Sequence, residues 1–136
     1  MIQRNIAYAQ DSGVHVEISV PMVVRDDLGT GVEDYFGIWD LVRKNTPIHL
    51  LKVFPANRFD GQSTPDEALF SMRKLLLSKM QFIYIENVFT DEGQNTRETH
   101  CPSCNKLLIR RVALQPEIFI DNRCPECNKV YVSNPA

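Results

Sequence analysis

The 136-residue sequence predicts an α/β fold with three parallel strands, followed by a small β tail built around a metal ion. Two observations lead to this prediction. Helical and strand-like segments alternate along residues 1–92, and such alternation is typical of parallel strands joined by right-handed crossovers. Residues 93–136 then carry all four cysteines of the chain, in two CxxC pairs whose spacing suits a metal site.

The first helix and the first two strands follow from side-chain periodicity. Apolar side chains recur at helical spacing over Ile2–Ser12, and Gly13 stands where a left-handed residue would end the helix. In residues 14–20, VHVEISV, apolar and polar side chains alternate with the period of a strand. Residues 48–54, IHLLKVF, are short, apolar and bounded by prolines, as expected of a largely buried second strand.

Two further helices are expected from their capping boxes, in which each side chain satisfies the other residue's backbone N–H. Thr30 and Glu33 would begin a helix over Val32–Asn45. Thr64 and Glu67 would begin another over residues 64–80, with proline at its first position. The third strand is expected over residues 82–88, and a turn-rich linker leads from it to the cysteines.

Three parallel strands make a small sheet. Residues 14–20 would leave one edge unpaired, and complete proteins usually cover such an edge. We therefore expect the chain to be part of a larger assembly.

The four cysteines form the motif C-x2-C-x19-C-x2-C. Two tight turns can bring four thiolates to one ion, with a hairpin of residues 107–114 and 117–123 between them. Four thiolates fill a tetrahedral shell and leave no open position, so the site is predicted to be structural and to hold zinc. Iron in a rubredoxin-like site is the alternative. The predicted metal ligands are Cys101, Cys104, Cys124 and Cys127.

Charge and hydropathy restrict the partners. The net charge is −2, and from Arg97 onward six basic residues face four acidic ones. A zinc ion with four thiolates adds about −2, which leaves no cationic surplus for phosphate, so nucleic acid is not favoured as a partner. No apolar stretch is long enough for a membrane span and no signal peptide is visible, so a cytoplasmic location without membrane contact is expected.

Several polar side chains in the strands allow two interpretations. His15, Glu17 and Ser19 share one strand face, which periodicity alone assigns more readily to solvent than to a barrel lumen. His49 is either a hydrogen-bonded core histidine or a lumen residue. Lys52 lies in an apolar strand, where its ammonium needs a partner, a ligand or a path to the surface.

An ordered set of segments resembles the C-terminal portion of radical S-adenosylmethionine enzymes of the AmmeMemoRadiSam type, relatives of the pyruvate formate-lyase activating enzymes. The resemblance covers the chain from about Gly13 onward. It implies that residues 1–92 form the last part of a partial, open α/β barrel and that residues 93–136 form a four-cysteine zinc ribbon. The segments are GVHVEIS, TPIHLLKVFPANR, TPDEAL, FIYIENV and NT…CPSCNKLLIRR…RCPECNKVYV.

The resemblance also implies a chemistry. In that family a 4Fe–4S cluster cleaves S-adenosylmethionine to a 5′-deoxyadenosyl radical, which abstracts hydrogen from a glycine of a partner enzyme in the activating enzymes. Four residues of this chain would border the S-adenosylmethionine site, and His15, Glu17 and His49 become better candidates for the lumen. The four bordering residues are Val23, Lys52, Phe54 and Pro55.

One departure from the family limits the expected activity. The C-x3-C-x2-C cluster motif is absent, so the chain alone is not expected to be active and is either a C-terminal fragment or a truncated relative. Its expected partner is the N-terminal half of the same enzyme or a glycyl-radical-type protein substrate. The alternative is a stand-alone zinc-ribbon module that binds protein or nucleic acid.

Overall fold

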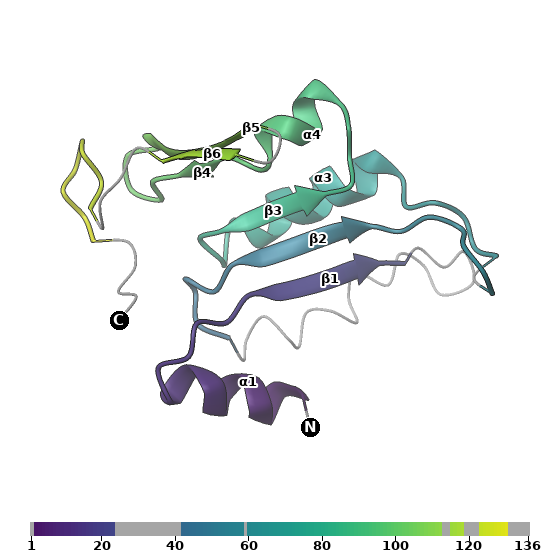
Figure 1. Cartoon of the computed structure of the whole chain (residues 1–136), viewed down its shortest axis with the longest axis horizontal. Coiled ribbons are helices and arrows are strands. Elements are labelled where there is room, and N and C mark those ends of the chain that lie inside the picture. Colours follow the sequence, from purple (N-terminus) through teal and green to yellow (C-terminus); the bar gives the residue numbers. More distant parts are fainter. Residues whose placement is uncertain (1, 24–41, 59, 113–114, 119–122, 131–136) are drawn as a thin grey trace. The chain divides into compact units, whose positions relative to one another are not determined.

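The computed structural model describes residues 2–23, 42–58, 60–112, 115–118 and 123–130 (Figure 1). The chain divides into two compact units, Met1–Val88 and Phe89–Ala136. The sequence placed this division slightly later, between residues 92 and 93. No helix within the described ranges has the length and apolar character that crossing a membrane requires.

The first unit contains a three-stranded parallel sheet. Its strands are β1 (Ile18–Met22), β2 (Ile48–Lys52) and β3 (Ile83–Glu86), side by side in the order β1-β2-β3 (Figure 1). Ile18 pairs with Ile48, and Ile48 with Ile83, so the strands run in register from the same end. The predicted parallel α/β arrangement is therefore confirmed. A barrel is not shown by these three strands.

The first strand begins later than the alternation of residues 14–20 predicted. Val14 is exposed, and the ladder starts at Ile18, whose N–H donates to the carbonyl of Pro47 at 3.0 Å. Because alternate residues face the same neighbour, the nitrogen of Pro21 points away from β2. A proline without an N–H is tolerated there because β1 is an edge strand of the described sheet.

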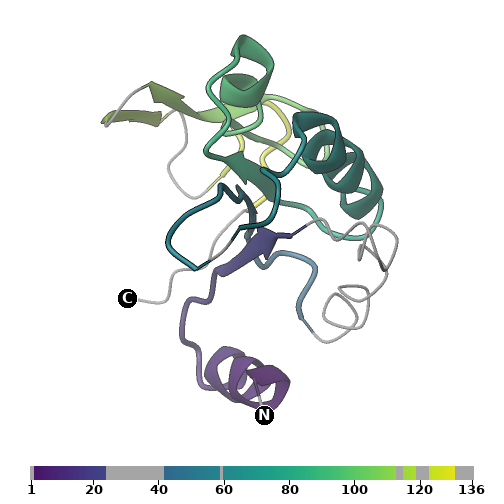
Figure 2. The same ribbon diagram turned by 90° about the vertical axis from the view of Figure 1, so that its right-hand side faces the viewer.

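One face of the sheet carries the core. Helix α3 (Asp66–Leu76) packs against β2 and β3 on this face, as the two ribbon views show (Figures 1 and 2). Helix α1 (Ile2–Asp11) is joined to the same unit by a buried hydrogen bond from Gln10 Nε2 to Thr46 Oγ1 at 2.6 Å. The fully buried side chains that α3 and the strands share are Ile48, Leu50, Leu69, Met72, Leu76, Ile83 and Ile85.

The capping box predicted for α3 is wrong. Pro65 is the N-cap residue and no side chain caps the helix. The hydroxyl of Thr64 is instead fully buried, where it accepts the N–H of Val53 at 2.9 Å and donates to the carbonyl of Met22. Backbone groups at the ends of β1 and β2 need hydrogen-bond partners, so the hydroxyl bonds to them and not to the N-terminus of α3.

The helix expected over Val32–Asn45 lies mostly outside the described residues, as do Thr30 and Glu33. In its described end, Val42–Asn45, the chain forms a turn rather than a helix, so the predicted end is wrong.

The second unit is a small antiparallel sheet. The order is β4 (Thr99–His100), β5 (Leu107–Val112) and β6 (Gln115–Ile118), and β5 pairs with both neighbours. The predicted hairpin between the cysteine pairs is confirmed by β5 and β6, while residues 113–114 and 119–122 of the predicted strands lie outside the described residues. The linker contains a short helix, α4 (Asp91–Asn95), that was not predicted.

Candidate functional site

The four cysteine sulfurs lie together in the second unit. All four Sγ atoms are within 4.8 Å of one another, with 3.6 Å between Cys101 and Cys127 and 3.5 Å between Cys104 and Cys124. A tetrahedral site with Zn–S bonds of about 2.3 Å places its sulfurs about 3.8 Å apart. The cluster could therefore hold a metal ion such as zinc.

Each CxxC pair sits on a turn of the same backbone design. In the first turn, the N–H of Asn105 donates to the carbonyl of Cys101, and the N–H of Cys101 donates to the carbonyl of Lys106, both at 2.8 Å. In the second turn, Asn128, Cys124 and Lys129 repeat these two bonds at 2.9 Å. The sequence repeat CPSCNK and CPECNK is thus a structural repeat.

Both turns need a residue in the left-handed region. Asn105 has φ of 59° and Asn128 has φ of 58°. Asparagine tolerates this region better than other residues with a Cβ atom, because its short amide can bond locally. This requirement explains why asparagine follows the second cysteine of each pair.

The backbone around the site favours thiolates, but the sulfurs crowd one another. Cys101 Sγ accepts the N–H groups of Ser103 at 3.4 Å and Cys104 at 3.3 Å. The backbone N–H of Lys106 lowers the pKa of Cys104, yet hydrogen bonding with Cys101 and the other thiols raises this pKa to about 12. A bound cation would relieve this crowding, because it would stabilise all four thiolates at once.

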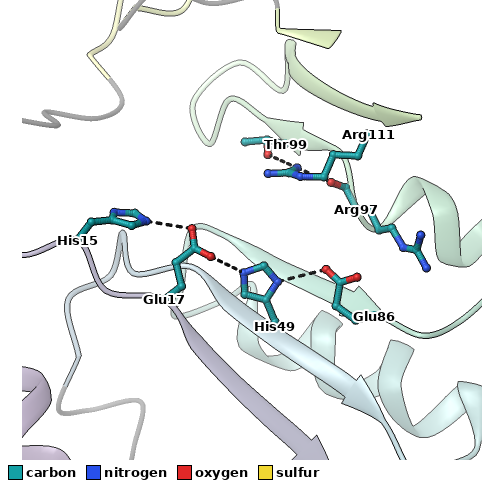
Figure 3. A network of polar contacts seen from close by, with 7 residues as sticks. All are labelled: His15, Glu17, His49, Glu86, Arg97, Thr99 and Arg111. Carbon is teal, nitrogen blue, oxygen red and sulfur yellow. Dashed lines mark hydrogen bonds and ion pairs between the residues drawn. The ribbon is translucent and has the colours of Figure 1, made fainter. Parts of the chain in front are cut away.

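A second group of polar side chains lies in the first unit, on the sheet face opposite the α3 core (Figure 3). His15 Nε2 is 2.9 Å from Glu17 Oε1, and Glu17 Oε2 is 3.1 Å from His49 Nε2. His49 Nδ1 is 3.2 Å from Glu86 Oε1. These four residues form a row that crosses the sheet, which we call the His–Glu row.

The row changes the protonation of its members. The hydrogen bond to Glu86 raises the pKa of His49 above its usual value, with further support from the charge of Glu17, although burial opposes this shift. The hydrogen bond from His15 lowers the pKa of Glu17, and His49 adds to the effect against burial. The row therefore favours the ionised form of Glu17 and the protonated form of His49.

The polar face at the beginning of the first strand is exposed, and two of its residues belong to the His–Glu row. His15 and Glu17 are exposed, as the solvated interpretation predicts, although both take part in the His–Glu row. The His49 side chain is only 20% exposed and is hydrogen-bonded, as expected of a histidine with partners in the fold. Ser19, the neighbour of His49 in β1, is exposed. Sequence reasoning did not include Glu86 in the group, although it lies on the same face, two residues beyond the register partner of His49.

The residues predicted to border a cofactor lie at or just beyond the carboxyl ends of β1 and β2. Lys52 forms an ion pair with Asp66 at 2.6 Å, which supplies the partner that its partly buried position requires. Its Nζ also lies 5.4 Å from the ring centre of Phe54, which is 47% exposed. Val23 is half-buried and Pro55 is exposed. Their role toward S-adenosylmethionine stays a prediction.

Comparison with known proteins gives one distant similarity. The chain is 31% identical over 116 residues to an uncharacterized protein of Methanocaldococcus jannaschii, MJ0808. The alignment covers 81% of this chain and 33% of that protein, so the chain spans about a third of the length of the curated relative it matches. No family model matches the chain, and no solved structure does.

Proposed function

We propose that this chain is the C-terminal part, or a truncated relative, of a radical S-adenosylmethionine enzyme of the glycyl-radical-activating type, and that its four cysteines hold a structural zinc ion. In the complete enzyme, the 4Fe–4S cluster and S-adenosylmethionine supply the radical. This chain contributes three strands of an open βα barrel, part of the barrel's polar lumen and a four-cysteine zinc ribbon.

The observation that carries the proposal is the His–Glu row on a parallel sheet. Strands of a parallel sheet are normally apolar on both faces, because helices cover both. Here one face packs against α3, whereas the other carries Glu17, His49 and Glu86 in hydrogen-bonded contact. A lumen that receives a polar ligand accounts for this asymmetry better than a second layer of helices.

The ends of the strands support the same assignment. In βα architectures, ligands lie at the carboxyl ends of parallel strands. At this end the Lys52–Asp66 ion pair and the buried Thr64 hydroxyl connect β1, β2 and the beginning of α3. The exposed ring of Phe54 beside them offers an apolar surface to a ligand.

The length of the relative and the cysteine count support a cluster motif in another part of the complete protein. The relative in M. jannaschii is about three times as long as the matched segment, so the missing cluster motif has room elsewhere in a complete protein. All four cysteines of this chain are in the ribbon site, which leaves none for a C-x3-C-x2-C cluster.

The rival proposal is a stand-alone zinc-ribbon module that binds protein or nucleic acid. Several cations of the described ribbon already have partners within it, which disfavours the nucleic-acid form because phosphate affinity depends on available cations. Arg110 pairs with Glu98 at 3.1 Å, and Arg111 donates to the backbone carbonyl of Arg97 at 2.6 Å. The Lys129 ammonium lies 2.6 Å from Ser103 Oγ.

The test compares this chain with the complete native protein, both purified anaerobically. For the isolated chain we expect one zinc per chain, no iron and no cleavage of S-adenosylmethionine. For the complete protein, or this chain with its N-terminal partner, we expect four additional irons and reductive formation of 5′-deoxyadenosine. A complete protein that lacks a C-x3-C-x2-C motif would exclude the proposal, and salt-dependent binding of DNA or RNA by the isolated chain would favour the rival.

A further inference from the structure

His49 has a carboxylate on each side of its ring. Its Nε2 faces Glu17 at 3.1 Å and its Nδ1 faces Glu86 at 3.2 Å. An ionised carboxylate only accepts hydrogen bonds, so both contacts are hydrogen bonds only when both ring nitrogens carry a proton. The arrangement therefore selects the imidazolium form of His49. It leaves neither nitrogen for a metal ion or a nucleophilic role.

The two carboxylates differ in how firmly the fold holds them. Glu86 is the last residue of β3 and its side chain is 31% exposed. Glu17 precedes β1, and its side chain is 49% exposed. Neutral imidazole carries a single N–H and can donate to only one of them. When His49 loses a proton, we expect it to keep Glu86 and to release Glu17, which can turn to water.

Glu17 stands where the first strand begins. The next residue, Ile18, opens the β1–β2 ladder by donating its N–H to Pro47 at 3.0 Å. Residues 14–17 are not part of a strand, so the Glu17–His49 contact holds this segment against β2. We propose that the Glu17–His49–Glu86 group is a proton-dependent latch that holds the segment before β1 on the sheet while His49 is protonated.

The titratable groups that face the latch favour ionised Glu17 and protonated His49. From the segment before β1, His15 donates to Glu17 and keeps it ionised. From β1, the register partner of His49 is the neutral Ser19. From β3, Glu86 supports the charged form of His49, and the Tyr84 ring lies 5.2 Å away in a tilted contact. Helix α3 packs on the opposite face. The latch does not depend on the proposed function.

The test uses the zinc-loaded full chain, labelled for nuclear magnetic resonance. The His49 ring and the exchange rate of the Ile18 amide would be followed from about pH 6 to pH 9, which spans the usual histidine pKa of about 6.5. Exchange rates are corrected for their intrinsic pH dependence. We expect His49 to titrate above about 6.5 with both ring nitrogens protonated below its midpoint. The Ile18 amide should lose protection several-fold at the same midpoint, whereas the buried helix residue Met72 should not.

Two variants with the same change of charge separate the latch from general effects. Glu17→Gln should lower the His49 midpoint and uncouple Ile18 exchange from it. Glu67→Gln, at an exposed position in the first turn of α3, should change neither. A His49 midpoint at or below about 6.5, or Ile18 protection that ignores the His49 titration, would overturn the latch. Neither result would bear on radical chemistry in the complete protein.

Discussion

The hydroxyl of Thr64 donates a hydrogen bond to the carbonyl of Met22, the last residue of β1. Thr64 directly precedes Pro65, the N-cap residue of α3. The same oxygen accepts the N–H of Val53, just after β2. One buried side chain thus connects the carboxyl ends of β1 and β2 to the segment that leads into α3. This is the end of the sheet where the proposed function places its ligand.

Replacement of Thr64 by valine should therefore destabilise the first unit. Valine keeps the shape but leaves the Val53 N–H and the Met22 carbonyl unsatisfied, at a cost of about 1–3 kcal/mol for a buried polar group. Thr64→Ser keeps the hydroxyl and should cost less. Denaturant unfolding of the two variants would measure the difference. Equal stability of the two would show that the hydroxyl has no structural role.

The metal content of the isolated chain should be one zinc and no iron. Removal of the ion with a chelator should unfold the second unit, because structural zinc sites supply folding energy, while the first unit keeps its structure. Elemental analysis and circular dichroism would measure both effects. About one iron per chain would instead indicate a rubredoxin-like carrier. About four irons would mean that the cysteines bind a cluster.

Zinc affinity should fall when a left-handed asparagine is replaced by alanine. Asn105→Ala keeps the Cβ in the left-handed region at φ of 59° but removes the amide that can bond locally, so the strain of about 1–2 kcal/mol is no longer offset. Because about 1.4 kcal/mol is tenfold in affinity, zinc binding should weaken by about tenfold. Asn105→Gly is the matched control and should bind zinc as the parent does. Competition with a chromophoric chelator would measure both, and equal affinity of the alanine variant would contradict the strain argument.

Stability should depend on pH through the His–Glu row. The pKa of His49 is raised, so its contribution is fully present below its unfolded value of about 6.5 and disappears as pH rises through the folded value. The pKa of Glu17 is lowered, so its contribution is present above its unfolded value and disappears as pH falls through the folded one.

Together these shifts predict a contribution that is greatest near pH 6 and declines toward alkaline pH. Denaturant unfolding of the zinc-loaded chain at several pH values above about 6, with His49→Gln as the comparison, would measure it. The parent should lose stability on going to alkaline pH, and the variant should show a flatter profile. Parallel profiles would assign the pH dependence to other groups.

The sequence by itself determined the features that depend on local chemistry. Period-two alternation and short apolar runs located three strands, although β1 begins four residues later than expected because its register depends on pairing with β2. The CxxC spacing identified a four-cysteine cluster, since each pair of ligands lies on one tight turn. The structure adds that each of these turns places an asparagine, Asn105 or Asn128, in the left-handed region.

Only the tertiary structure decided which polar groups meet. The spacing of Thr64 and Glu67 in the sequence matches a capping box. In the fold the threonine hydroxyl is buried near the ends of two strands, so it bonds to Met22 and Val53 instead. His49 lies 37 residues from Glu86 and 32 from Glu17 in the chain, and parallel pairing places all three on one sheet face. Local sequence encodes turns and periodicity, whereas contacts across strands depend on register, which forms only when distant segments pair.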